Sequence, residues 1–116
     1  MKTKKLKNIV VTDFHPKPYG RYTTDGPGCE LSSGEVFRDK VLAPALRDYD
    51  LVHVDLTGYN RYGRSFLDEA FGGLIRESGF NYQELKEKLT YDHESVKSIL
   101  QVIDERIEAA ERDRNS

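Results

Sequence analysis

Residues 51–56 of the chain read Leu-Val-His-Val-Asp-Leu, and this stretch decides the fold class. Its aliphatic residues stand on both sides of an extended chain, which is typical of an interior strand in a parallel sheet that is covered on both faces. A half-exposed strand alternates more strictly between apolar and polar residues. We therefore predict that residues 50–56 form the central strand of the sheet in an α/β domain.

A polar and aromatic loop and a helix follow this strand. The loop, residues 57–63, reads Thr-Gly-Tyr-Asn-Arg-Tyr-Gly. Ser65, with Asp68 three positions later, indicates the N-cap of a helix over residues 65–78. Its apolar stripe is Leu67, Phe71, Leu74 and Ile75.

Two glycines stand inside this helix, at positions 72 and 73. Each costs about 1 kcal/mol relative to alanine in a helix interior. Their presence predicts that the helix closely approaches the sheet or another backbone at this point.

The N-terminal part of the chain predicts two strands and a loop. Residues 7–14 form a short run rich in β-branched residues, with prolines just beyond it, and this pattern favours a strand. Residues 21–24 predict a second, shorter strand. The Gly/Pro-rich segment that follows predicts an exposed loop.

A helix is expected over residues 34–48. Ser32 and Glu35 match a capping box, in which each side chain bonds a backbone N–H at the start of the helix. Pro44 lies inside this stretch and removes one helical hydrogen bond. We expect a kink or break near residues 41–43.

The C-terminal part predicts two helices and a short strand. Asn81 caps a short helix over residues 82–88, a strand follows at 89–91, and Asp92 caps the last helix. The apolar stripe of that last helix is Val96, Ile99, Leu100, Ile103, Ile107 and Ala110. A charged tail begins at about residue 108. Residues 1–116 are therefore expected to form a single α/β domain with a mixed sheet and about four helices.

Composition restricts the classes of function. The chain has 116 residues, with 18 basic and 20 acidic side chains, so its net charge of −2 favours neither nucleic acid nor an anionic membrane. No apolar run approaches the ~20 residues of a membrane span, and no secretory signal is expected. Cys29 is the only cysteine and matches no catalytic motif. These features predict a cytoplasmic protein.

Residues 37–80 strongly resemble the bacterial STAS-like domain family, whose function is unassigned. The matching residues are Phe37-Arg38, Leu42-Ala43-Pro44-Ala45-Leu46, Val54-Asp55-Leu56 and, above all, the run YGRSFLDEAFGGL at 62–74. The Tyr19-Gly20-Arg21-Tyr22 segment and the final helix also fit. The resemblance implies a small STAS-like α/β fold over most of the chain.

This family is distantly similar to the anti-sigma-factor antagonists. The resemblance implies that Ser65 corresponds to the serine that a histidine-kinase-like ATPase phosphorylates in those proteins. The chain departs from their pattern at Gly63-Arg64, where the antagonists carry Asp-Ser, and at Phe66, where they carry glycine. Ser65 is therefore a candidate phosphorylation site, and the alternative is that it only caps its helix.

Two surfaces are candidates for binding a partner protein, because tyrosine and arginine are enriched at binding hot spots. The first consists of Tyr59, Arg61, Tyr62, Arg64, Ser65 and Asp68. The second consists of Tyr19, Arg21 and Tyr22. We expect no catalytic residues, no cofactor and no metal site, because His15, His53 and His93 lack metal-ligand spacing.

The sequence therefore predicts a non-catalytic regulatory protein-interaction module, with another protein, such as an ATPase-type kinase, as its partner. The alternative is an adaptor or inhibitor, for example in phage defence or counter-defence, that contacts nucleic acid or a nucleoprotein complex through Arg21, Arg61 and Arg64. A hydrolase that uses Ser65 and Asp68 is the least favoured hypothesis, because the sequence places no histidine near them as a base.

Overall fold

The computed structural model describes residues 5–115. Three strands form one sheet in the order β1-β2-β3, with β1 at Leu6–Val10, β2 at Leu51–Asp55 and β3 at Leu89–Asp92. Both strand pairs are parallel. The prediction of a central strand at residues 50–56 is roughly met by β2, whereas the mixed sheet is wrong for the part of the chain that the structure describes.

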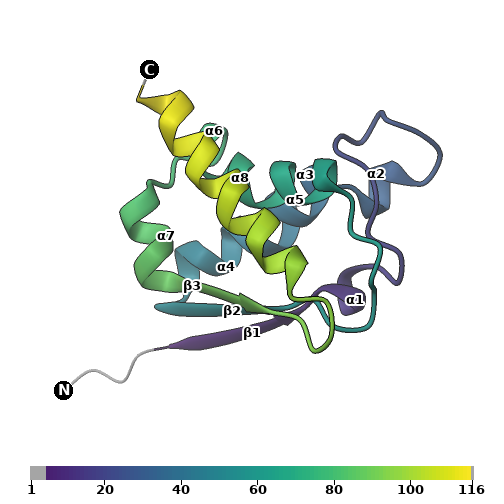
Figure 1. Cartoon of the computed structure of the whole chain (residues 1–116), viewed down its shortest axis with the longest axis horizontal. Coiled ribbons are helices and arrows are strands. Elements are labelled where there is room, and N and C mark those ends of the chain that lie inside the picture. The colour runs from purple at the N-terminus through teal and green to yellow at the C-terminus, as the bar shows by residue number, and fades with distance from the viewer. Residues whose placement is uncertain (1–4, 116) are drawn as a thin grey trace.

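The sheet is covered on one face only. Val52 and Val54 are fully buried under the helices, which lie on one side of the strands in Figure 1. The opposite face carries Leu51, His53 and the side chains aligned with them on the neighbouring strands, and none of these is buried. The prediction of cover on both faces is therefore wrong. In this register His53 and Asp55 fall on the open face, so β2 alternates between buried and partly exposed residues.

The first strand is shorter than expected, and no second strand follows it directly. β1 ends at Val10, and Val11–Phe14 form the helical turn α1. Residues 21–24 form a bend rather than a strand. The Asp25 carboxylate accepts the backbone N–H groups of Arg21 and Tyr22 at 2.9 and 3.0 Å, which favours a turn over an extended chain.

The first long helical segment has a wide turn in its middle. It consists of α3 (Gly34–Phe37), the π-helical turn η1 (Arg38–Leu42) and α4 (Ala43–Asp48). In a regular α-helix the Pro44 ring would clash with the carbonyl four residues earlier, and the wide turn avoids this clash. The structure differs from the predicted kink or break near residues 41–43, because the helical segment continues unbroken through a π-helical turn at Arg38–Leu42.

The start of this segment differs from the predicted capping box. Ser33, not Ser32, caps α3 by accepting the Val36 N–H. Ser32 instead donates its hydroxyl hydrogen to the Tyr19 carbonyl at 2.9 Å, and Glu35 accepts the Thr23 N–H at 3.0 Å. Both side chains hold the preceding loop, which also contains the short helix α2 (Cys29–Ser32).

A second helical segment with the same design follows β2. It consists of α5 (Arg64–Leu67), the π-helical turn η2 (Asp68–Gly72) and α6 (Gly73–Arg76). This segment crosses the first one at Gly34, where an added Cβ would lie 2.5 Å from the Phe66 carbonyl oxygen.

The predicted close approach of this segment to another backbone is confirmed at Gly72, whereas Gly73 meets a side chain. An added Cβ on Gly72 would lie 3.1 Å from the Arg106 carbonyl oxygen, and one on Gly73 would collide with the Arg38 side chain.

The C-terminal elements agree closely with the sequence except at one cap. Asn81 and Glu84 form a capping box at the start of α7 (Tyr82–Lys88), as an asparagine cap there predicts. The last helix, α8, begins at Ser98 and continues to Arg114. Asp92 belongs to β3 and does not cap α8, so that prediction is wrong.

Helix α8 buries four residues of its predicted stripe, Ile99, Ile103, Ile107 and Ala110, against the second helical segment. Its buried stripe reaches beyond the predicted start of the charged tail at residue 108. With four longer helical segments and two single turns, the expectation of about four helices is roughly met. No helix among residues 5–115 has the length and hydropathy that a membrane crossing requires.

Candidate functional site

The loop between β2 and α5 leaves the sheet at the carboxyl ends of the parallel strands, where open α/β sheets commonly bind ligands. The Asp55 carboxylate accepts the Thr57 N–H at 2.9 Å. This hydrogen bond, the largest effect on that carboxyl, lowers the pKa of Asp55 below its ordinary value. Gly58 then turns the chain with φ +102° against Thr12. The start of the loop is thus held by the Asp55 carboxylate and by the close approach of Gly58 to Thr12 of α1.

His93 connects this loop to the segment before α8. Its Nδ1 accepts the backbone N–H groups of Ser95 and Val96 at 3.0 and 2.9 Å. Because Nδ1 is an acceptor, the hydrogen of a neutral ring stands on Nε2, which lies 2.9 Å from the Tyr59 carbonyl and donates to it. The ring is buried. No sequence pattern indicated a structural role for His93, whose Tyr59 partner lies 34 positions away, although Ser95 and Val96 are only two and three positions along the chain.

Aromatic rings form the inner side of the loop. Tyr62 packs between Tyr59 and Phe66, with ring centroids 5.1 and 5.8 Å away, and its hydroxyl donates to the Leu56 carbonyl at 3.0 Å. Burial raises the pKa of the Tyr62 phenol above its ordinary value. Tyr62 is therefore committed to the loop's own structure, whereas Tyr59 is half-exposed.

The outer side of the loop presents Arg61, Arg64 and Ser65, all of which are exposed. Gly63 is the N-cap of α5, and no side chain accepts a hydrogen bond there. Ser65 is the second residue of the helix, so the prediction that it caps the helix is wrong. Its hydroxyl lies on the surface beside Arg64.

Asp68 and the neighbouring Glu69 lie in η2 and form the centre of a buried ion network. Asp68 is 8% exposed. Its carboxylate oxygens lie 2.5 Å from a guanidinium nitrogen of Arg21, 3.2 Å from one of Arg76 and 3.7 Å from one of Arg106. Burial alone would raise the pKa of Asp68, but its arginine partners outweigh burial and lower that pKa. As it lies, Asp68 stabilises the chain rather than facing a partner.

Glu69 has its own arginine, Arg38 of η1. The two side chains meet at 2.5 Å, each 5% exposed, and Arg38 also bonds the Glu69 carbonyl. The ion network therefore joins the two π-helical turns. The sequence patterns did not predict the ion pair of Glu69 with Arg38, nor the pairing of the arginines of α6 and α8 with Asp68. Arg106 follows Ile103 by three positions on the apolar stripe of α8, and this placement was an available signal.

The second predicted surface lies on the loop that precedes α3. Tyr19, Tyr22 and Leu31 are 66%, 46% and 63% exposed, and we call these three residues the α2-loop patch. Arg21 from this loop reaches Asp68, so the structure joins the two predicted surfaces through an ion pair. The nucleic-acid alternative requires Arg21 as a surface cation, and its pairing with acids reduces that support.

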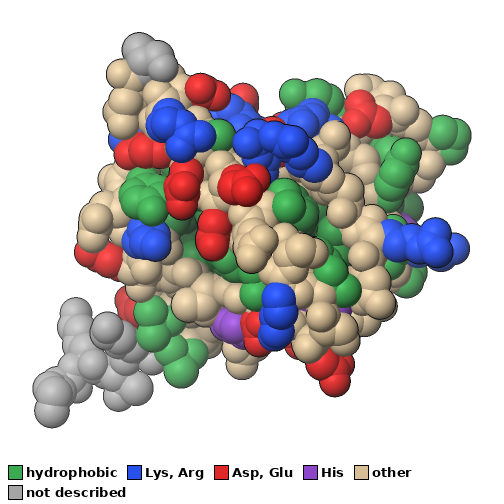
Figure 2. All heavy atoms as spheres, viewed as in Figure 1, with side chains coloured by type: hydrophobic (Ala, Val, Ile, Leu, Met, Phe, Trp, Pro, Cys, Tyr) green, Lys and Arg blue, Asp and Glu red, His purple; other side chains and the backbone are tan. Residues whose placement is uncertain are grey.

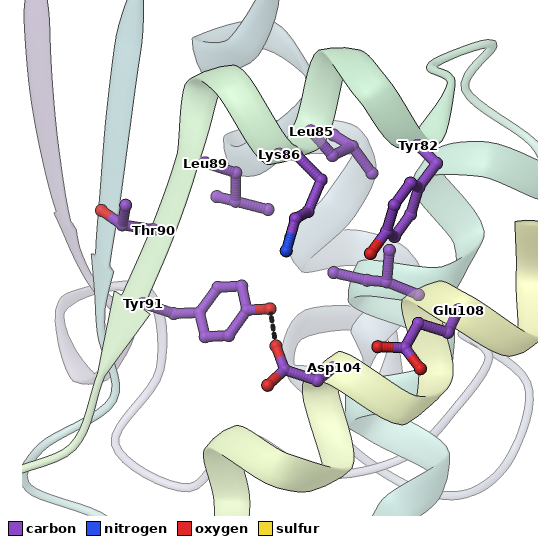
Figure 3. A pocket seen from close by; sticks show the side chains of 9 residues that line it. Tyr82, Leu85, Lys86, Leu89, Thr90, Tyr91, Asp104 and Glu108 are labelled. Atoms are coloured by element: carbon purple, nitrogen blue, oxygen red, sulfur yellow. Dashed lines mark hydrogen bonds between the residues drawn. The ribbon is translucent and has the colours of Figure 1, made fainter.

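A further pocket lies between α7, β3 and α8 (Figure 3). Tyr91 donates its hydroxyl hydrogen to Asp104 across the pocket, and Lys86 and Glu108 also line it. Burial and the Asp104 contact raise the pKa of the Tyr91 phenol. No sequence pattern indicated this pocket. Within residues 5–115, no group of three or more His, Cys, Asp or Glu side chains is arranged to hold a metal ion.

Comparison with protein families agrees with the sequence resemblance. A family model described as a STAS-like domain of unknown function (DUF4325) matches residues 33–98, from the cap of α3 to the first residue of α8. Neither the curated proteins nor the solved structures contained a match to the chain. The match to this family covers more than half of the sequence. The chain therefore belongs to the family of STAS-like domains of unknown function.

Proposed function

We propose that the chain is a non-catalytic regulatory module that binds another protein. The observation that supports this most strongly is the α2-loop patch. Of the four large hydrophobic side chains that stand exposed in residues 5–115, three belong to this patch. Exposed tyrosines supply a large contact area at a low cost in conformational entropy, and large apolar side chains exposed on one loop are typical of an interaction site.

The base of the loop that carries the patch is held in place. The Tyr19 N–H donates to the Ser32 carbonyl at 3.0 Å, and the Gly34 N–H donates to the Gly20 carbonyl at 2.9 Å. The Arg21 ion pair with Asp68 adds a third connection. A loop ordered before binding loses less entropy when it meets a partner, which favours affinity.

The exposed residues of the β2–α5 loop are proposed to extend this partner surface. Arg64 and Ser65 start α5, close to where α3 crosses it at Gly34. If the partner is an ATPase-type kinase, as the likeness to anti-sigma-factor antagonists suggests, Ser65 is the residue it phosphorylates. A phosphate there would gain the positive end of the helical segment and the neighbouring guanidinium of Arg64.

Affinity purification from the native host tests this proposal. The wild-type chain is compared with a Tyr19→Ser/Tyr22→Ser variant and with Leu6→Ser, which changes an equally exposed apolar residue on the open face of the sheet. We expect a specific partner with the wild type and with Leu6→Ser, and at least a tenfold loss with the double variant. Mass spectrometry of the same samples detects phosphate on Ser65.

Titration with purified components then tests whether the patch binds the partner directly. The captured partner is produced separately and titrated against the same three chains. Equal affinity of the double variant and the wild type would remove the α2-loop patch from the proposal. Release of a small-molecule product by the purified chain would contradict its non-catalytic part.

A further inference from the structure

Four arginines meet in the ion network around η2, and their charges are unequally matched. Arg38 is balanced, because Glu69 lies 2.5 Å and Asp39 3.0 Å from it. The other three, Arg21, Arg76 and Arg106, converge on Asp68. Among residues 5–115, the only other acid within 4.0 Å of these three is Glu69, at 3.5 Å from Arg21 and Arg76. We call Arg21, Arg76 and Arg106 the arginine triad.

The triad comes from three separate segments of the chain. Arg21 lies in the α2 loop, Arg76 ends α6, and Arg106 lies in α8. Figure 2 shows basic side chains gathered over the region where α5, α6 and α8 meet in Figure 1. The triad side chains are 28%, 29% and 21% exposed. Each of the three side chains is therefore partly buried and partly in contact with water.

Arg106 is the member of the triad least committed to the acids. Its closest carboxylate oxygen, on Asp68, is 3.7 Å away, beyond hydrogen-bond distance. Its Nε–H is buried and has no hydrogen-bond acceptor among the described residues. A buried donor left without a partner costs about 1–3 kcal/mol, so the network as it stands is incomplete.

Gly72 allows this convergence. A Cβ at this position would lie 2.8 Å from Arg76 Nη1, 3.1 Å from the Arg106 carbonyl and 3.1 Å from Asp68 Oδ1. The glycine therefore lets α8 approach η2 closely enough for Arg76 and Arg106 to share one carboxylate. It stands in a π-helical turn, and such turns often occur at functional sites.

We infer that the arginine triad binds a phosphate group, as inorganic phosphate or as a phosphomonoester. The four arginines of the network face three acids, Asp39, Asp68 and Glu69, so one positive charge is unmatched and favours a bound anion. The planar guanidinium fork also matches phosphate oxygens with two parallel hydrogen bonds. The remaining donors of three arginines from three directions suit a tetrahedral group better than a second planar carboxylate. This inference does not rest on the proposed function.

The test follows the Nε–Hε signals of the arginines by NMR while inorganic phosphate is added at constant ionic strength, with chloride as the reference salt. We expect the Arg106 signal to move and saturate, with a dissociation constant on the order of 1 mM, or about −4 kcal/mol. Arg106→Gln should weaken binding at least tenfold. Arg47→Gln, which removes an exposed arginine of α4, should leave binding unchanged.

Further arms of the experiment identify the source of the phosphate and guard against a folding defect. O-phosphoserine and adenosine monophosphate are titrated in the same way, and whichever saturates at the lowest concentration identifies the carrier. Arg106→Lys keeps the charge without the fork and should bind several times more weakly than the wild type. The inference is overturned if no phosphate compound gives a saturable shift, or if Arg106→Gln and Arg106→Lys both bind as the wild type does.

Discussion

His93 holds the β2–α5 loop with both nitrogens of one ring. Nδ1 accepts two backbone N–H groups before α8, and Nε2 donates to the loop through the Tyr59 carbonyl. A single side chain therefore closes the gap between two segments that follow neighbouring strands. The position of the exposed residues on the outer side of the loop depends on this connection.

Two substitutions separate these roles of His93. His93→Ala leaves three backbone groups without partners and should lower the free energy of unfolding by about 2 kcal/mol. In His93→Asn the shorter side chain can still accept the Ser95 and Val96 N–H groups, so the loss should be about 1 kcal/mol. Urea unfolding followed by circular dichroism measures both. Equal losses in the two variants would contradict the role of Nδ1.

At the scale of the elements, the main feature is the crossing of the two helical segments at Gly34. A Cβ added to this glycine would lie 2.5 Å from the Phe66 carbonyl oxygen and 3.1 Å from the Ala70 backbone nitrogen. Both neighbours are backbone atoms of the opposite segment and cannot turn aside. The crossing therefore requires a residue without a side chain.

Gly34→Ala tests this crossing. In an ordinary helix the change from glycine to alanine raises the free energy of unfolding by about 1 kcal/mol. Here we expect a loss of about 2–3 kcal/mol, because the methyl group forces the two segments apart. Gly26→Ala is the control, since an added Cβ there meets nothing within 4 Å, and its effect should stay within about 0.5 kcal/mol. Thermal and urea unfolding measure both variants, and a neutral Gly34→Ala would disprove the tight crossing.

At the scale of the whole molecule, the Asp68 network connects the α2 loop, both helical segments and α8. The pKa of Asp68 is lowered in the folded state, so its carboxylate stabilises the fold at pH values above its ordinary pKa of 3.8. This contribution is lost as the pH falls through the lowered pKa. Acid should therefore loosen the α2 loop, the second helical segment and α8 together, because the arginines that pair with Asp68 lie in these three segments.

Asp68→Asn measures this contribution. At pH 7 the variant should lose about 2–3 kcal/mol, because three arginines keep their positions without the charge that attracts them. The difference from the wild type should shrink as the pH falls below about 4. Urea unfolding at a series of pH values measures this difference. The control is Asp113→Asn, which changes an exposed acid near the end of α8. A difference that persists unchanged in acid would show that the charge of Asp68 is not its cause.

Local sequence patterns predicted the elements better than the site. The aliphatic run of β2, the Asn81 cap and the stripe of α8 are encoded by neighbours in the sequence, and the fold contains them. The pairing of Arg21 with Asp68 spans 47 positions, so no local pattern contains it. Asp92 resembled a helix cap by residue type, but its pairing with Asp55 on β2 made it part of a strand.

The two π-helical turns have a consequence for how this chain tolerates changes in length. A π-helical turn contains about one residue more than an α-helical turn, and it absorbs that residue without rotating the helix that follows. Removing one residue from η2 would therefore restore a regular α-helix and leave the later residues on their original faces. In η1 the same removal would bring the Pro44 ring against the carbonyl four residues earlier. Removal from α8, which has no such turn, would rotate its apolar stripe by about 100° away from the core.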